Sequence, residues 1–389
     1  MVAASAKAPF RYAFAGMAGM AAVMGIGRFV YTPILPGMME ELGLSPGDMG
    51  LIASANYLGY LVGAIVAAGG WATGRERSIL VLGLVANTVL TLGMGLTDGM
   101  AAFLLIRFLG GVATAIVMVF LAAIVFAELA LAGRSDLQAV HFGGVGVGIA
   151  TSSAMIALLI LEGAGWRTAW FGAGTLTLVG LVIVAVLIER LPAGTHQAVR
   201  EPPLPRTRPV GLLILAYGLF GLGYIVTATF LIAIVREGGA SRLFEALVWL
   251  ATGLAIIPSI WLWWKVGNRI GMRGAFAAGC LVEAVGVTAS VAADDRIGPL
   301  FGGVLLGGTF VALTAIGLHA GRSLAPASPR RMLAIMTAAF GLGQIAGPIA
   351  AGFLVDWTGD YVLASLAATT VLLLSGAVCL MSRESLKLP

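Results

Sequence analysis

Long apolar stretches alternate with short polar ones along almost the whole chain. Each apolar stretch is long enough for a helix of about 20 residues, which crosses the ~30 Å hydrocarbon core of a bilayer. Twelve such stretches occur in two sets of six, and they predict membrane-spanning helices at about residues 11–36, 47–70, 78–97, 100–127, 137–161, 166–188, 209–235, 243–265, 274–292, 297–320, 331–355 and 361–381. The polar residues 189–208 between the two sets are rich in proline and arginine, which predicts a helix-breaking linker.

The pattern therefore predicts an all-α membrane protein. We expect an N-terminal six-helix bundle at residues 1–190, a cytoplasmic linker at 191–208 and a C-terminal six-helix bundle at 209–389. The polar segment before Phe10 is short and the apolar run after it is long, so the first helix is expected to stay in the mature protein rather than to be cleaved as a signal peptide.

Composition agrees with a chain that lies in lipid. Of the 389 residues, 59% are hydrophobic and 11% are charged, and the mean hydropathy is +1.01. Soluble domains carry about 25% charged residues, so an ordinary soluble globular protein is excluded. The 55 glycines follow no period, which favours close helix–helix packing over a collagen-like repeat.

The positions of Lys and Arg predict the orientation, because cytoplasmic segments are enriched in both. With the N-terminus placed in the cytoplasm, seventeen of the 23 basic residues fall on inside segments and four on outside segments. The other two are Arg28 and Arg107, which lie within predicted spans. We therefore expect both termini to be cytoplasmic.

The two halves also resemble each other in sequence. Four features recur at an offset of 196 to 198 residues, each in the corresponding predicted helix or loop. They are Gly25 and Gly27 with Gly221 and Gly223, Gly74 with Gly271, Gly110-Gly111 with Gly307-Gly308, and Phe142-Gly143 with Phe340-Gly341. Parallel repeats of six helices are the architecture of one large class of transporters.

Several motifs resemble those of the major facilitator superfamily, and the resemblance covers essentially the whole chain. Arg107, Gly111 and Ala115 are similar to the fourth-helix signature Arg-x-x-x-Gly-x-x-x-Ala. Gly165-Trp166-Arg167 precedes the sixth helix, as is frequent in the superfamily. Residues 25–36 together with 53–60 resemble the bacterial YbfB/YjiJ-like subgroup, which implies no particular substrate but does imply a bacterial inner-membrane location.

The loop signature of that superfamily, Gly-x-x-x-Asp-Arg-x-Gly-Arg-Lys, is only partly present. Residues 74–77 match its end, but Trp71 stands where the signature has aspartate. The second copy, residues 268–273, matches better. The resemblance assigns a gating role to the polar loop residues Arg75, Arg77, Asn268, Arg269 and Arg273.

Arg28 and Arg107 are the main candidates for a binding site. The resemblance places both on helices that line the central cavity, and a helical rise of ~1.5 Å per residue puts them about 18 and 14 Å from the outer surface. An arginine at such depth is a functional candidate by default. The second half has Tyr224 and Val304 at these positions, so the fold itself does not require the charges. A planar guanidinium suits a carboxylate or phosphate ligand. The alternative for Arg107 is a structural contact with carbonyls or hydroxyls.

Other polar residues are expected to complete the hydrogen bonding of a bound anion. They are Tyr31, Asn56, Tyr57 and Tyr60 in the first half, and Tyr224, Thr227 and Gln344 in the second. The competing interpretation is that such residues join helices to one another.

Three titratable residues are candidates for proton coupling. Glu283 is the one acidic residue near mid-membrane, about 15 Å deep. The resemblance puts its helix at the periphery, which favours a protonated or locally paired structural group. His141 and His319 lie toward cytoplasmic helix ends, where a hydrated histidine without a transport role is the alternative.

The sequence thus predicts a secondary active transporter, not an enzyme, that moves a small, monocarboxylate-like organic anion by alternating access with proton coupling or exchange. No cofactor, metal or nucleic acid is expected. The sequence has no nucleotide-binding loop, no His and Cys residues at the spacing of metal ligands, and no patch of basic and aromatic residues that would bind nucleic acid. A small-molecule substrate and the lipid bilayer are the expected partners of a monomer. One alternative is a proton-coupled exporter of hydrophobic or cationic drugs, and another is a membrane sensor or assembly partner that does not transport.

Overall fold

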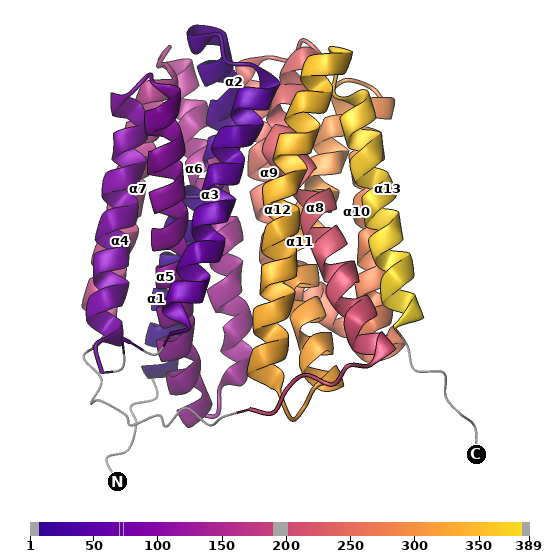
Figure 1. Cartoon of the computed structure of the whole chain (residues 1–389). Coiled ribbons are helices and arrows are strands. Elements are labelled where there is room, and N and C mark those ends of the chain that lie inside the picture. The colour runs from indigo at the N-terminus through magenta and orange to yellow at the C-terminus, as the bar shows by residue number, and fades with distance from the viewer. Residues whose placement is uncertain (1–7, 70, 73, 190–200, 383–389) are drawn as a thin grey trace. The chain divides into compact units, whose positions relative to one another are not determined.

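The computed structural model describes residues 8–69, 71–72, 74–189 and 201–382, and every regular element in these ranges is a helix (Figure 1). Twelve helical segments are long and apolar enough to cross a membrane. The predicted all-α, twelve-span architecture is therefore confirmed. Most of the predicted linker, residues 191–200, lies outside the described ranges, as do the basic residues at positions 7, 190, 200, 383 and 387.

The first half of the chain contains the elements α1 to α7. Their bounds are α1 Ala8–Met20, the π-helical η1 Ala21–Ile26, α2 Tyr31–Leu42, α3 Pro46–Ala67, α4 Glu76–Gly93, the 3₁₀ turn η2 Met94–Leu96, α5 Met100–Leu131, the 3₁₀ turn η3 Ser135–Leu137, α6 Gln138–Leu161 and α7 Trp166–Leu187. The first predicted span thus corresponds to three consecutive pieces rather than one helix.

The second half contains α8 to α13. Their bounds are α8 Arg208–Glu237, α9 Arg242–Ile270, α10 Met272–Ala292, α11 Ile297–Leu324, α12 Pro329–Thr358 and α13 Val362–Met381. Pro258 in α9 and Pro348 in α12 lie inside continuous helices.

The chain forms two compact units that do not follow the sequence halves strictly. The first unit comprises Met1–Leu44, Ala55–Gln197 and Ser241–Ile257, and the second comprises Ser45–Ser54, Ala198–Ala240 and Pro258–Pro389. The boundary between the units therefore falls within α3 and within α9, so that one part of each helix belongs to the first unit and the other part to the second. The domain boundaries predicted from the sequence stay a prediction.

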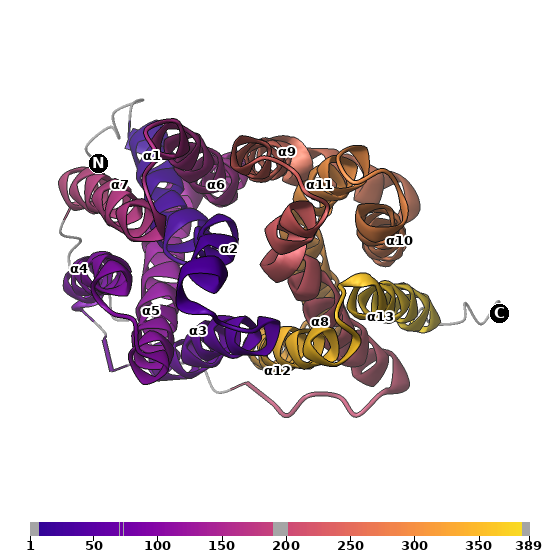
Figure 2. The same cartoon turned by 90° about the horizontal axis from the view of Figure 1, so that it is seen from above.

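Glycines allow close helix contacts inside the first unit, where α1 and η1 pack on α6 and α4 packs on α7 (Figure 2). A Cβ atom added at Gly144 would lie 2.2 Å from the Met17 carbonyl oxygen, and one at Gly148 would lie 2.3 Å from that of Ala21. Such contacts leave no room for a side chain. This explains the glycine-rich stretch on α6, since van der Waals packing of backbones is what holds helices together in lipid.

In the second unit, α8 packs on α12 and α13, and α10 packs on α11 and α13 (Figure 2). A Cβ atom at Gly343 would lie 2.3 Å from the Gly218 carbonyl oxygen, so α12 and α8 approach each other as closely as α6 and α1 do.

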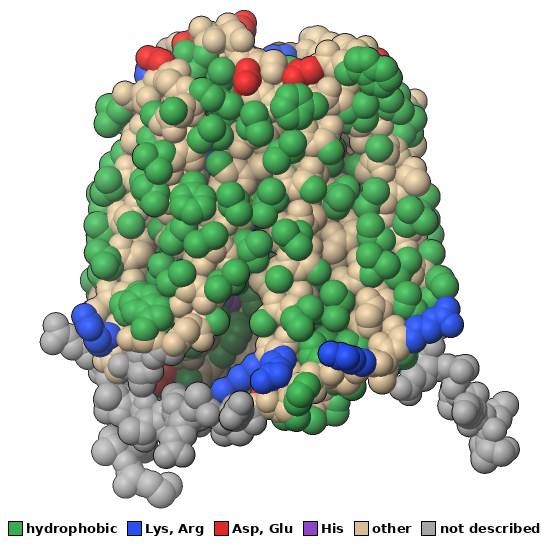
Figure 3. All heavy atoms as spheres, in the orientation of Figure 1, with side chains coloured by type: hydrophobic (Ala, Val, Ile, Leu, Met, Phe, Trp, Pro, Cys, Tyr) green, Lys and Arg blue, Asp and Glu red, His purple; other side chains and the backbone are tan. Residues whose placement is uncertain are grey.

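The surface of the helices is apolar along their middle, and Lys, Arg, Asp and Glu side chains gather near the helix ends (Figure 3). That distribution is the one expected for a protein surrounded by lipid.

Candidate functional site

The first membrane span is interrupted at residues 27–30. In η1 the backbone hydrogen bonds reach five residues back, with the Gly27 amide donating to Ala22 O at 2.8 Å and the Phe29 amide to Met24 O at 3.2 Å. The α-helix resumes at Tyr31. Pro33 has no N–H to donate to the carbonyl of Phe29, so an unbroken α-helix would leave that carbonyl without its helical hydrogen bond. Wide turns of this kind are frequent at functional sites.

Arg107 of α5 binds the carbonyls that this interruption leaves available. Its Nη1 donates to Gly27 O at 3.0 Å and its Nη2 to Arg28 O at 3.2 Å. The guanidinium also lies over the ring of Tyr31, 4.9 Å from the centroid, and the residue is 3% exposed. These contacts favour the structural alternative for Arg107, in which its charge closes the broken helix instead of meeting a ligand.

Arg28 lies within the interruption and has a different environment. Its Cζ is 4.6 Å from the ring centroid of Tyr57 and 4.7 Å from that of Tyr60, both within cation–π distance. The residue is 2% exposed, and its Nε and Nη2 have no hydrogen-bond partner within the described part of the chain. None of the ion pairs found among the described residues includes Arg28 or Arg107.

The tyrosines that contact Arg28 are carried by α3, which lies against α5 at three glycines. Added Cβ atoms would lie 1.9 Å from Phe108 O at Gly59, 2.6 Å from Val112 O at Gly63 and 2.0 Å from Asn56 O at Gly111. The Nδ2 of Asn56 also donates to Arg107 O at 2.9 Å. Asn56 therefore joins the two helices, and the glycines set how near the tyrosine rings come to Arg28.

Tyr60 makes one further contact in the first unit, from its hydroxyl to the Met118 sulfur at 2.8 Å. The structure thus brings together all six predicted first-half residues: Arg28, Arg107, Tyr31, Asn56, Tyr57 and Tyr60.

The predicted residues of the second half meet in the second unit. Gln344 of α12 donates through Nε2 to the Tyr224 hydroxyl of α8, and the Oε1 of Gln344 and the Oγ1 of Thr227 are buried without a hydrogen-bond partner in the described ranges. The Tyr224 ring stacks on Phe310 and Phe340, with centroids 5.5 Å away in both cases. Tyr224 therefore occupies, inside a stack of aromatic rings, the repeat position of Arg28.

Comparison with known proteins assigns the family. A model of the family described as uncharacterised MFS-type transporter YbfB matches residues 20–380. The chain belongs to this family of the major facilitator superfamily. It is therefore a multi-pass membrane transporter, and the superfamily consists of transporters rather than enzymes. Membership of the major facilitator superfamily and of its YbfB-like subgroup, expected from the sequence motifs, is confirmed.

Two Bacillus subtilis proteins are similar in sequence to this transporter. The uncharacterized MFS-type transporter YceJ is 24% identical over 67% of this chain and 68% of its own length. Multidrug resistance protein 2 is 25% identical over 65% of this chain and 65% of its own length. A crystal structure of the nucleoside transporter NupG has a TM-score of 0.72 and 14% identity, and the match covers 97% of this chain and 99% of the other. That likeness shows the major facilitator fold.

The superfamily's loop residues lie at helix ends in this transporter. Arg77 donates from Nε to Ile188 O at 2.6 Å and from Nη2 to Ala185 O at 2.9 Å, so it caps the C-terminus of α7. Arg273 donates to Ser382 O after the end of α13. The other three gating candidates, Arg75, Asn268 and Arg269, are exposed. Arg77 and Arg273 thus make analogous caps in the two repeats, and a role for them in gating stays a prediction.

The three proton-coupling candidates occupy unlike environments. Glu283 of α10 is fully buried, and its Oε2 is 2.9 Å from the Thr309 hydroxyl of α11. That hydroxyl is also 2.7 Å from Leu305 O. The Thr309 hydroxyl donates to Glu283 Oε2, and it also lies 3.1 Å from Leu306 O. His141 is fully buried between Phe126 and Phe142, whereas His319 is exposed beside Trp264.

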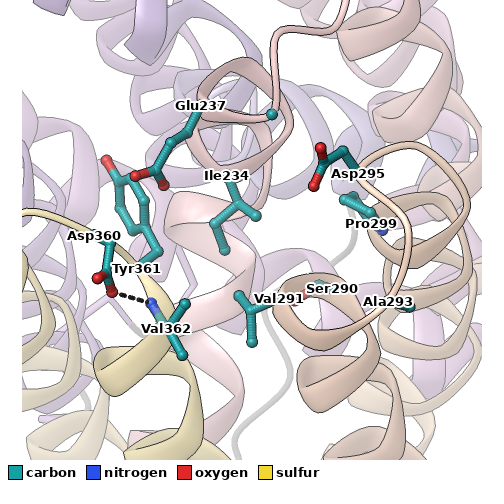
Figure 4. Close-up of a pocket in the computed structure, with 11 residues that line it drawn as sticks. Ile234, Glu237, Ser290, Val291, Ala293, Asp295, Pro299, Asp360, Tyr361 and Val362 are labelled. Atoms are coloured by element: carbon teal, nitrogen blue, oxygen red, sulfur yellow. Dashed lines mark hydrogen bonds between the residues drawn. The ribbon is translucent and has the colours of Figure 1, made fainter.

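An acidic hollow of about 230 Å³ lies at the ends of helices in the second unit (Figure 4). Its carboxylates come from Glu237, Asp295 and Asp360, and Asp360 accepts the Val362 amide at 2.8 Å, which caps α13. Burial raises the pKa of the Tyr361 phenol, and the negative charges of Glu237 and Asp356 add to that effect. The hollow is a feature of the helix ends, and its lining includes none of the predicted site residues.

Two buried polar residues near Arg107 were not predicted. Asn87 of α4 is 2% exposed and Trp170 of α7 is fully buried. Both helices are peripheral in the superfamily's architecture, whereas the main predicted candidates, Arg28 and Arg107, belong to helices that the resemblance places around the cavity. A polar residue or indole in the middle of an otherwise apolar span was the signal available.

Proposed function

We propose that this transporter moves a small organic anion of the monocarboxylate type by alternating access, with coupling to protons or exchange. The observation that carries the proposal is the unpaired edge of Arg28. Its Nε and Nη2 hydrogens point the same way along one edge of the planar group, and both nitrogens lack a hydrogen-bond partner within the described residues. Such an edge binds a carboxylate with two parallel hydrogen bonds.

The surroundings of Arg28 support an anionic ligand rather than a structural counter-ion. The tyrosine rings stabilise the cation without satisfying its N–H groups. A buried charge that lacks such satisfaction costs several kcal/mol, and a bound carboxylate would offset that cost. Arg107 has both terminal nitrogens occupied by carbonyls, so it offers only Nε and cannot form the same fork. We therefore assign the anion contact to Arg28.

Burial of the Arg28 edge fits a transport cycle. With 2% exposure, the side chain meets the substrate only after neighbouring groups move. Alternating access supplies such movement, because the site opens to each side of the membrane in turn. In the second unit, Thr227 and Gln344 each have a buried oxygen without a partner in the described ranges, and their role in substrate binding stays a prediction.

The second candidate function is export of hydrophobic or cationic drugs, and it is favoured by the similarity to multidrug resistance protein 2. A cationic cargo needs an acidic group in the membrane interior. Glu283 is fully buried there, but its described hydrogen bond is to Thr309 of the neighbouring helix α11, and α10 is a peripheral helix in the superfamily's architecture. This arrangement supports the anion carrier over the drug exporter. A protein that does not transport is the third alternative.

Uptake into proteoliposomes separates these functions. We expect saturable uptake of at least one radiolabelled carboxylate from a panel of monocarboxylates and dicarboxylates, with nucleosides and amines as comparison substrates. Proton release driven by drugs, without carboxylate uptake, would support the exporter. No flux of either kind would contradict both transport assignments and favour a sensor or assembly partner.

The role of Glu283 is tested by Glu283→Gln. We propose that the carboxyl is a neutral structural group, so the neutral amide is expected to keep proton-driven uptake within about twofold of the wild type, as an isosteric change that removes no charge. Uptake is measured with and without an imposed pH gradient. Loss of gradient-driven uptake with retained substrate exchange would instead identify Glu283 as the proton carrier.

We propose an inner-membrane monomer with both termini in the cytoplasm, because basic residues gather on the segments that this orientation places inside. Labelling of single cysteines placed in the loops with a membrane-impermeant thiol reagent, from each side, tests the orientation.

A further inference from the structure

A small cavity in the first unit is lined by buried polar atoms whose hydrogen-bonding capacity is unused. Its volume is about 10 Å³, and its lining includes Asn87, Arg107 and Trp170, from α4, α5 and α7. The Oδ1 of Asn87, the Nε of Arg107 and the Nε1 of Trp170 all lack a hydrogen-bond partner within the described ranges. A buried polar atom destabilises the folded state unless some group satisfies it, so these three atoms call for a shared partner.

The chemistry of these atoms specifies what satisfies them. The Arg107 Nε–H and the Trp170 Nε1–H can only donate, and the Asn87 carbonyl oxygen can only accept. Their common complement is a group that accepts two hydrogen bonds and donates one. A water molecule does this, and a cavity of about one probe sphere has room for a single water.

The orientation of the Asn87 amide follows from its other contact. Its Nδ2 lies 3.2 Å from the Thr114 hydroxyl, which donates to Val23 O at 3.4 Å. Because the Thr114 hydrogen is directed to Val23, the Thr114 oxygen acts as the acceptor and the Asn87 amide nitrogen as the donor. The Asn87 oxygen is then left for the cavity. A halide ion would accept from Arg107 and Trp170 but could not donate to this oxygen.

We propose that one buried water binds between Asn87, Arg107 and Trp170 and completes the hydrogen bonding of the Arg107 guanidinium. Arg107 then has all three nitrogens satisfied, two by the carbonyls of the interrupted first span and one by water. Asn87 and Trp170 become positioning residues, since they hold Arg107 against the backbone of Gly27 and Arg28. The site exists whatever the cargo, so it goes beyond the proposed function and does not depend on it.

The direct test is a crystal structure of the full chain at a resolution that shows ordered waters, grown with bromide in place of chloride. We expect a density peak within about 3 Å of all three atoms and no anomalous signal at the bromide edge. An anomalous peak there would replace the water with a halide site. A cavity without a density peak would overturn the proposal outright.

A double-mutant cycle tests the coupling through the water in solution. Trp170→Phe removes the indole donor and Asn87→Leu removes the acceptor, and thermal unfolding of the purified protein is measured for both singles and the double. We expect the drop in Tm of the double variant to be smaller than the sum of the single drops, because both changes remove the same water.

The matched control uses the neighbouring tryptophan of α7. The Nε1 of Trp166 donates to Glu41 Oε2 at 3.0 Å and takes no part in the cavity. Trp166→Phe combined with Asn87→Leu is expected to give additive drops in Tm. Additive drops for Trp170→Phe with Asn87→Leu as well would show that no shared molecule joins the two residues.

Discussion

Arg28→Lys is expected to reduce the affinity for the anionic substrate about 100-fold, and Arg28→Gln at least as much. Truncating one partner of a buried, hydrogen-bonded charge pair costs about 2–5 kcal/mol, and each 1.4 kcal/mol is about tenfold in affinity. Lysine keeps the charge but loses the planar fork, so it makes one contact where arginine makes two. The measurement is the substrate Kd from thermal shift, together with initial uptake rates in proteoliposomes.

The effect of the Arg28 substitutions on stability, measured as Tm, differs from their effect on substrate binding. Arg28 has unsatisfied nitrogens in its buried state, so Arg28→Gln removes an unpaired charge and is expected to leave Tm unchanged or raised. The control is Arg167→Lys in the same unit, where the guanidinium donates to Gly95 O at 3.1 Å, pairs with Asp98 and is exposed in part. It should keep uptake within about twofold, as surface ion pairs are worth about 0–1 kcal/mol.

Each outcome for Arg28 has a distinct meaning. Normal affinity in Arg28→Lys with lost affinity in Arg28→Gln would show that the charge binds the substrate and the fork does not. Normal uptake in both variants would contradict the anion assignment, while the transporter and its fold would be unaffected.

The twelve spans could be predicted because one physical rule sets them all. A helix in lipid must be about 20 residues long and apolar, and both properties are visible in the sequence. The constant offset between the two halves could be recognised as well, because many glycines mark places where helix backbones are in contact. Gly111 shows the limit of that reading. A Cβ atom added at its repeat partner Gly308 would meet open space, whereas Gly111 lies against α3.

The interruption of the first span was not predicted, since residues 11–36 were expected to form one helix. The span contains Pro33 and Pro36, yet the break lies before both, at residues 27–30, and is accompanied by a π-helical turn. The location depends on Arg107, which binds the released carbonyls from another helix. A contact across 79 or 80 residues of sequence has no local signature.

The distinction between the two arginines also required the structure. In the sequence, Arg28 and Arg107 fall at similar depth and offer the same chemistry. Which nitrogens are occupied depends on where carbonyls and tyrosine rings lie in three dimensions, and of the two only Arg28 keeps a two-nitrogen edge without partners in the described part of the chain. The cavity beside Arg107 was invisible for the same reason, because its polar atoms come from three separate helices.

Gly111→Ala is expected to lower Tm by about 1–4 °C and to weaken substrate binding. Its Cβ atom would lie 2.0 Å from Asn56 O and 2.7 Å from Tyr60 N, and both are backbone atoms that cannot turn aside. Helix α3 must therefore move away from α5. Overpacking of this kind costs about 1–3 kcal/mol. For a chain of 389 residues, that cost corresponds to a drop in Tm of about 1–4 °C. Differential scanning fluorimetry of the purified transporter measures it.

Gly111→Ala should lower substrate affinity as well as stability, because α3 carries the tyrosine rings that contact Arg28. A shift of α3 moves Tyr57 and Tyr60 relative to the guanidinium, so affinity falls even in the fraction that remains folded. The adjacent residue provides the control. A Cβ at Gly110 would meet only Asn56 Nδ2, at 3.7 Å, and alanine is the better helix former by about 0.5–1 kcal/mol. Gly110→Ala should therefore keep or raise Tm and leave affinity unchanged. Equal effects of the two changes would show that the α3–α5 contact does not set the geometry around Arg28.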